Sequence, residues 1–221
     1  MRNILFIGAH PDDIEIGCGG TVIEHIKNSD NVFALVVTDG EQGVKKNTKG
    51  YKRYNRLEET TEALKSTGIK DSNLIFLHLS DTMLWKARHL LLGSLEKTFE
   101  KFCFDRVYTH TEKSYHQDHV TVNQETLRSL RNNAKIDILT YETNGSTKPE
   151  FIPNYFVEIG DVIEKKINAL KYHESQSDKF TNNSELIITL AKFRAHQAKI
   201  VSYSEAFEVK RINWKGNNSN I

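Results

Sequence analysis

A short apolar run that ends in a small-residue turn constrains the fold of this chain more than any other feature. Residues 4–7 read Ile-Leu-Phe-Ile and have no polar face, as expected of a strand covered on both sides. Gly8 and Ala9 allow a close turn, and residues 14–28 have the apolar spacing of a helix that lies on a sheet. A buried strand followed by such a helix is typical of α/β proteins with a parallel sheet.

The alternation of strands and helices continues along the chain. Strands are expected at 31–38, 73–79, 106–109, 136–141 and 155–159, and helices at 54–67, 87–102, 118–132, 160–173 and 184–200. This pattern predicts a Rossmann-like, three-layer α/β/α fold with a mostly parallel sheet. We expect a single domain over residues 1–213 and a polar C-terminal tail at 214–221.

The balance of charges gives no reason to expect nucleic acid as a partner. The 221 residues include 30 Lys and Arg against 29 Asp and Glu, for a formal net charge of +1. Two cysteines, Cys18 and Cys103, are too few for a disulfide framework and fit a reducing compartment. No apolar run suits a membrane span or a signal peptide, so we expect a cytoplasmic protein. The sequence leaves the oligomeric state open, a homo-oligomer included.

Ionisable residues stand directly after the first strand, where open α/β sheets bind their ligands. His10 and Asp13 are three residues apart, and we expect the first turn of a helix to place both on one side. A catalytic zinc site takes a third protein ligand and leaves one position for water. The loop after the strand at 106–109 supplies His119 as that ligand, because neighbouring strand ends lie about 5 Å apart. Such a site can also hold iron(II) or cobalt.

The residues beside these ligands suit the same chemistry. Asp12 is not needed as a ligand and can take a proton from the water that the metal activates. His116 can donate a hydrogen bond to the oxyanion of the substrate, and Asp118 can bond one histidine and fix its tautomer. Taken singly, His10 could instead cap the helix, and the aspartates could complement the helix dipole. A second His-Asp-His cluster at the same edge of the sheet favours the metal.

Several motifs stand at the expected strand ends or on the helices that follow. They are His-Pro-Asp-Asp at 10–13, Gly-Cys-Gly-Gly-Thr at 17–21, Thr-Asp-Gly-Glu-Gln-Gly at 38–43, Arg56 with Glu59 and Ala63, His-Gln-Asp-His at 116–119, and the segments 156–176 and 203–207. Together they resemble the LmbE-like or PIG-L family, the GlcNAc-phosphatidylinositol de-N-acetylases. The resemblance covers nearly the whole chain, and the two aspartate-histidine motifs at separate strand ends make it specific.

The resemblance implies zinc-dependent hydrolysis of an N-acetyl group on an N-acetylglucosamine-type sugar or its conjugate. It implies that His10, Asp13 and His119 bind the metal, that Asp12 is the base, and that His116 assists at the oxyanion. Two positions depart from the family. Gln117 stands where the family often has proline, and Tyr115 stands where some relatives have another substrate-contacting residue, which leaves the identity of the substrate open.

Three further residues are candidates for binding the substrate. Arg56 and Asp81 could bind sugar hydroxyls, with a surface ion pair or a loop cap as the alternative. Tyr203 could line the pocket, with ordinary packing as the alternative. The lysine-rich residues 39–53 could form a solvated loop or a lid over the sugar. The remaining histidines, at 25, 78, 89, 110, 173 and 196, have no partner at ligand spacing and are expected to be structural or exposed.

Two other functions stay open as alternatives to a sugar deacetylase. One is a non-catalytic module that binds a sugar or a nucleotide, although the intact Asp12 and His116 argue against it. The other is a zinc amidase or esterase that acts on a non-sugar substrate. A dinucleotide cofactor is disfavoured because the glycines within residues 17–20 do not have the GxGxxG spacing.

Overall fold

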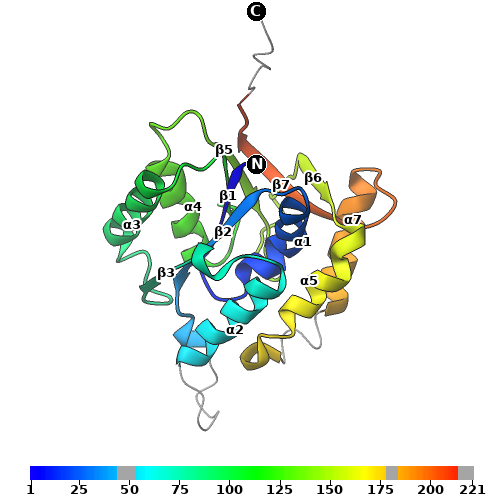
Figure 1. Cartoon of the computed structure of the whole chain (residues 1–221), viewed down its shortest axis with the longest axis horizontal. Coiled ribbons are helices and arrows are strands. Elements are labelled where there is room, and N and C mark those ends of the chain that lie inside the picture. Colours follow the sequence, from blue (N-terminus) through cyan, green and yellow to red (C-terminus); the bar gives the residue numbers. More distant parts are fainter. Residues whose placement is uncertain (44–52, 178–183, 214–221) are drawn as a thin grey trace, which may run out of the picture.

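A seven-stranded sheet organises the residues that the computed structural model describes, which are 1–43, 53–177 and 184–213. Its strands follow the order β3-β2-β1-β4-β5-β7-β6 (Figure 1). Their bounds are β1 (Asn3–Gly8), β2 (Asn31–Thr38), β3 (Leu74–Leu79), β4 (Arg106–His110), β5 (Asp137–Tyr141), β6 (Tyr155–Glu158) and β7 (Ser204–Arg211). The first five strands pair in parallel, whereas β7 pairs antiparallel with both β5 and β6.

Helices cover both faces of this sheet, as Figure 1 shows. They are α1 (Asp13–Lys27), α2 (Arg53–Ser66), α3 (Arg88–Lys101), α4 (Gln117–Ser129), α5 (Ile163–Leu170) and α7 (Ser184–Gln197). Alternate residues of β1 point to opposite faces, so Leu5 and Ile7 share a core with α3 and α4. Ile4 and Phe6 share the other core with α1 and α2. The expected three-layer fold with a mostly parallel sheet is confirmed.

Strand β7 was not predicted from the sequence. Charged residues interrupt the apolar pattern of this strand, and one of them, Glu205, is buried. Its carboxylate accepts a hydrogen bond from the Lys166 ammonium at 2.6 Å. It also accepts hydrogen bonds from the backbone N–H groups of Gly20 and Thr21 at 2.9 and 2.7 Å. These bonds satisfy a charge that would otherwise be costly to bury, so the strand tolerates it inside the fold.

One smaller difference concerns the C-terminal half. The helix expected at 160–173 is shorter, because a 3₁₀ turn over Gly160–Val162 precedes α5. The expected tail at 214–221 and most of the expected loop, residues 44–52, lie outside the described residues. Within the described ranges, no helix combines the length and the apolar character that crossing a membrane requires.

Close packing of α1 on the sheet depends on its glycines. A Cβ built on Gly17 would lie 2.8 Å from Tyr141 Cε2 and 2.9 Å from the carbonyl oxygen of Glu142, at the end of β5. A Cβ on Gly20 would lie 2.6 Å from Ile159 Cγ2. The helix that carries Asp13 therefore sits at a fixed, short distance from the sheet.

Gly17→Ala is expected to lower the free energy of unfolding. Overpacking costs about 1–3 kcal/mol and outweighs the gain in helix propensity of about 1 kcal/mol. Gly93→Ala is the matched control, because Gly93 lies in α3 and a Cβ there meets nothing within 4 Å. Urea denaturation followed by circular dichroism measures both variants, and equal effects would contradict the packing argument.

Candidate active site

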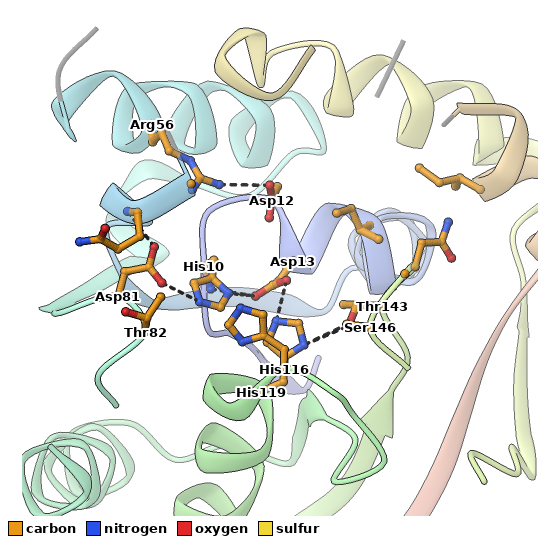
Figure 2. A pocket seen from close by; sticks show the side chains of 16 residues that line it. His10, Asp12, Asp13, Arg56, Asp81, Thr82, His116, His119, Thr143 and Ser146 are labelled. Atoms are coloured by element: carbon orange, nitrogen blue, oxygen red, sulfur yellow. Dashed lines mark hydrogen bonds and ion pairs between the residues drawn. The ribbon is translucent and has the colours of Figure 1, made fainter. Parts of the chain in front are cut away.

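A cavity of about 420 Å³ opens at the carboxyl ends of the parallel strands, where sheets of this kind bind their ligands. The loops after β1, β2, β3, β4 and β5 all contribute to its wall. The expected site residues that line it are His10, Asp12, Asp13, Arg56, Asp81, His116 and His119. Figure 2 shows the imidazoles of His10, His116 and His119 close to Asp13, with Asp12 and Arg56 above them.

The carboxylate of Asp13 lies between the other two expected metal ligands. Its Oδ2 is 3.2 Å from His10 Nδ1, and its Oδ1 is 3.3 Å from His119 Nε2. The backbone N–H of His10 also donates to Oδ2 at 2.8 Å. His10 and Asp13 were expected to share the first turn of a helix, but they do not. α1 begins only at Asp13, and His10 belongs to the turn after β1.

The donor atoms of this cluster suit a divalent transition metal. The described residues contain three groups in which one donor atom from each member lies within 4.8 Å of the others: His10, His116 and His119; Asp13, His110 and His119; and His10, Asp81 and Asp118. The expected ligand set is divided between the first two groups, which share His119. Imidazole and carboxylate donors that are buried together favour zinc, iron(II) or cobalt over calcium or magnesium.

His110 is a member of the cluster that the sequence analysis missed. Its ring stacks on that of His119, with centroids 3.9 Å apart and planes at 13°. Its Nε2 lies 3.1 Å from Asp13 Oδ2 and accepts the N–H of Ala9 at 3.0 Å. Burial, then repulsion from His119, lowers the pKa of His110 to about 3, so the ring is neutral. His110 is the last residue of β4, a strand-end position that could have indicated it.

His116 stands at the N-terminus of α4 and faces the cavity. Its Nδ1 accepts the backbone N–H of Asp118 at 3.3 Å, which leaves the proton of the neutral ring on Nε2. Burial, then repulsion from His10 and His119, lowers the pKa of His116. The ring is therefore neutral at pH 7 and can act as a hydrogen-bond donor.

The backbone at Asp12 is held in a left-handed conformation, with φ of 107°. Such a conformation costs a non-glycine residue about 1–3 kcal/mol and is characteristic of functional sites. The buried guanidinium of Arg56 contacts this turn: Nη2 donates to Asp12 Oδ2 at 3.1 Å and to the carbonyl of Pro11 at 2.7 Å. Its Nη1 donates to the carbonyl of Gly40 at 2.6 Å. The hydrogen bonds of Arg56 thus connect the loops after β1 and β2.

Two carboxylates contact the far nitrogen of His10. Asp81 Oδ1 and Asp118 Oδ2 lie 3.2 and 3.3 Å from Nε2. Asp118 is fully buried and also accepts the N–H of Thr82 at 2.7 Å, so it lies behind His10 instead of facing a substrate. Burial alone would lower the pKa of His10, but hydrogen bonds with Asp118, Asp13 and Asp81 hold it well above its ordinary value.

Tyr203 does not line the cavity, contrary to the expectation from the sequence. Its backbone carbonyl accepts the N–H of Ile159 at 2.9 Å where β7 begins. This pairing places the ring against the apolar cluster that contains Ile159 and Ala191, with Lys192 Nζ 5.8 Å from the ring centroid. The ordinary packing considered as the alternative describes Tyr203.

Zinc binding is expected to release protons at pH 7. His10 carries a proton in the metal-free protein because its pKa is raised, and a metal can bind Nδ1 only after the imidazole loses a proton. The apparent zinc affinity should therefore fall as the pH falls below that pKa. Isothermal titration calorimetry in buffers of different ionisation enthalpy measures the release, and an enthalpy that is independent of the buffer would contradict it.

Asp118→Asn provides a control for this measurement. The substitution keeps the size of the side chain but removes one of the charges that stabilise protonated His10. The variant should release fewer protons than the unmodified protein on binding zinc at the same pH.

Comparison with known proteins identifies the family. Residues 5–130 match the PIG-L family, described as GlcNAc-PI de-N-acetylase. The chain is also 34% identical over 180 residues to the uncharacterized deacetylase YaiS of Escherichia coli K12, an alignment that covers 79% of this chain and 91% of YaiS. This chain belongs to the PIG-L family of deacetylases, as the motifs predicted.

Solved structures share the fold. The N,N'-diacetylchitobiose deacetylase of Pyrococcus horikoshii has a TM-score of 0.78 and 25% identity, with 94% of this chain and 83% of that chain covered. GalB, the 4-carboxy-2-hydroxymuconate hydratase of Pseudomonas putida KT2440, has a TM-score of 0.79 with 16% identity, and the match covers 98% of this chain and 99% of that chain. Because a hydratase has the same fold, the reaction has to be argued from the site.

Proposed function

We propose that this protein is a zinc-dependent deacetylase that removes the N-acetyl group from an N-acetylglucosamine-type sugar or its conjugate. The observation that carries the proposal is the pair of carboxylates at one cavity: Asp13 between two imidazoles, and Asp12 beside a guanidinium. Membership of the PIG-L family and the likeness to the diacetylchitobiose deacetylase support this choice of substrate.

His10, Asp13 and His119 are the proposed metal ligands. The facing atoms are His10 Nδ1, the Asp13 carboxylate and His119 Nε2. Bound zinc, or iron(II) or cobalt in its place, would activate a water molecule and polarise the acetyl carbonyl. Both carboxylates that contact His10 Nε2 favour a proton on that atom, which leaves Nδ1 as the donor to a metal.

Asp12 is the proposed general base. Arg56 Nη2 donates to its Oδ2 at 3.1 Å, and an ionised carboxylate can accept a proton. Asp12 takes a proton from the attacking water and gives it to the amine nitrogen as the carbon–nitrogen bond breaks. The products are acetate and the free amino sugar.

His116 is the proposed donor to the acetyl oxygen. Its Nε2–H is directed by the hydrogen bond that Nδ1 accepts from Asp118, and its lowered pKa keeps the ring neutral. A neutral imidazole can stabilise negative charge on that oxygen, and it does not transfer a proton to the substrate before the reaction begins.

Arg56 is proposed to position Asp12 instead of binding sugar hydroxyls. Its two terminal nitrogens already donate to Asp12, Pro11 and Gly40. The Asp81 carboxylate likewise accepts the N–H of Gln42 at 3.0 Å and contacts His10. Both residues line the cavity, but the terminal nitrogens of Arg56 and both carboxylate oxygens of Asp81 are engaged within the protein.

Asp12→Asn is expected to lower turnover about 100-fold or more, because the amide cannot accept the proton. Asparagine tolerates the left-handed backbone, so the fold and the bound zinc should be retained. Release of free amine from N,N'-diacetylchitobiose measures turnover, and elemental analysis measures zinc. Full activity in this variant would remove Asp12 from the mechanism.

Arg56→Lys is expected to lower kcat about 10-fold or more while KM stays within about 3-fold. The single nitrogen of an ammonium cannot occupy the positions of both Nη1 and Nη2, so the three hydrogen bonds cannot all be kept and Asp12 loses its position. Steady-state kinetics separate the two constants. A raised KM with unchanged kcat would show instead that Arg56 binds the substrate.

A substrate comparison separates the proposal from its alternatives. The zinc-loaded protein should release amine from N-acetylglucosamine glycosides much faster than from acetamides or acetate esters that lack a sugar. Equal rates on both classes would favour a general amidase or esterase. Binding of the sugars without release of amine would favour the non-catalytic module.

A further inference from the structure

Three hydroxyl groups surround the nitrogen of His119 that faces away from Asp13. Thr143 Oγ1, Ser146 Oγ and Ser114 Oγ lie 3.2, 3.3 and 3.4 Å from Nδ1. Figure 2 shows Thr143 and Ser146 on the side of this ring opposite to His10 and Asp13. Asp13 Oδ1, 3.3 Å from Nε2, occupies the other end of the same ring.

The hydroxyls come from two loops that are tied together by their backbones. Ser114 belongs to the loop after β4, and the other two belong to the loop after β5. Tyr115 N donates to the carbonyl of Ser146 at 2.7 Å, and Lys148 N donates to that of Lys113 at 2.8 Å. Ser114 and Thr143 are also buried, so their hydroxyls are held in place and kept from bulk water.

The existing hydrogen bonds restrict what each hydroxyl can do. Ser114 Oγ donates its proton to the carbonyl of Ser146 at 3.2 Å, so toward His119 it can only accept. Thr143 Oγ1 and Ser146 Oγ share one hydrogen bond at 2.7 Å, which uses one of their two protons. The three hydroxyls can therefore accept a hydrogen bond from Nδ1–H, and one of their protons stays free to rotate.

Different contacts fix the plane of the His119 ring and its flip about the Cβ–Cγ bond. His119 is stacked between His110, at 3.9 Å and 13°, and His116, at 4.6 Å and 21°. Stacking fixes the plane of a ring, but it does not distinguish the two orientations that are related by a 180° flip about the Cβ–Cγ bond. The hydrogen bond at Nδ1 supplies the missing constraint, because it directs Nε2 toward Asp13.

We infer that Thr143, Ser146 and Ser114 form the positioning group of His119, which accepts its Nδ1–H and leaves Nε2 as the metal-binding atom. The inference rests on the proposed function, because it assigns partners to a proposed metal ligand. Metal-binding histidines are usually oriented by a carboxylate or a carbonyl. A hydroxyl group adds no negative charge to the site, and it can also donate to Nδ1 when Nε2–H bonds to Asp13 in the metal-free protein.

The test compares zinc affinity in variants of the full-length protein. The triple substitution Ser114→Ala, Thr143→Val and Ser146→Ala should weaken zinc binding about 10-fold or more, measured by competition with a chromophoric chelator. Thr143→Ser keeps a hydroxyl and should bind zinc as the unmodified protein does. Thr98→Val is the matched control for loss of a buried threonine hydroxyl, because Thr98 Oγ1 donates to the carbonyl of Ser94 within the same helix, α3.

A second measurement needs no substitution that could prevent folding. Nitrogen-15 spectra of the histidine rings in the unmodified protein should show the proton of His119 on Nδ1 once zinc is added. Unchanged zinc affinity in the triple variant, or zinc at Nδ1, would overturn the inference while the proposed function stands. A raised KM with unchanged zinc affinity would also overturn it, because the hydroxyls would then contact the substrate. A protein that binds no zinc at all would overturn both proposals.

Discussion

The site depends on the contact of the buried Asp13 carboxylate with two imidazoles, those of His10 and His119. Burial would raise the pKa of Asp13, but attraction to His119 and His110 holds it well below its ordinary value. The carboxylate therefore stays charged inside the protein. A buried charge of this kind needs partners, and the loops after β1 and β4 meet around it. The close packing of α1 on β5 in turn sets the height of Asp13 above the sheet.

Much of this arrangement could be predicted because it follows from chain topology. Parallel strands present their carboxyl ends at one edge, so motifs that follow different strands must lie near each other. His10 and His119 are more than a hundred positions apart, yet the strand-end rule alone places them together. The apolar run at 4–7 predicted β1 for a different reason: a strand that is covered on both faces has no polar side.

The features that were not predicted depend on contacts between side chains distant in sequence. His110 ends β4, and nothing in the sequence marks that its ring stacks on His119. Arg56 is a polar residue of α2 whose guanidinium reaches Asp12 only once α2 has packed beside the loop after β1. Likewise, Glu205 interrupts the pattern of β7 and is acceptable only because Lys166 of α5 and the backbone N–H groups of Gly20 and Thr21 contact its carboxylate. Patterns along a chain report burial and periodicity, but not which partners will meet.

The left-handed backbone at Asp12 has a consequence for how this protein can change over time. Glycine at this position would relax the backbone, but it would remove the carboxylate that the proposed reaction needs. Selection for greater thermal stability and selection for turnover would therefore favour opposite residues at a single position. Descendants that lost the activity would be free to replace Asp12, so its presence in a relative is a simple marker of retained chemistry.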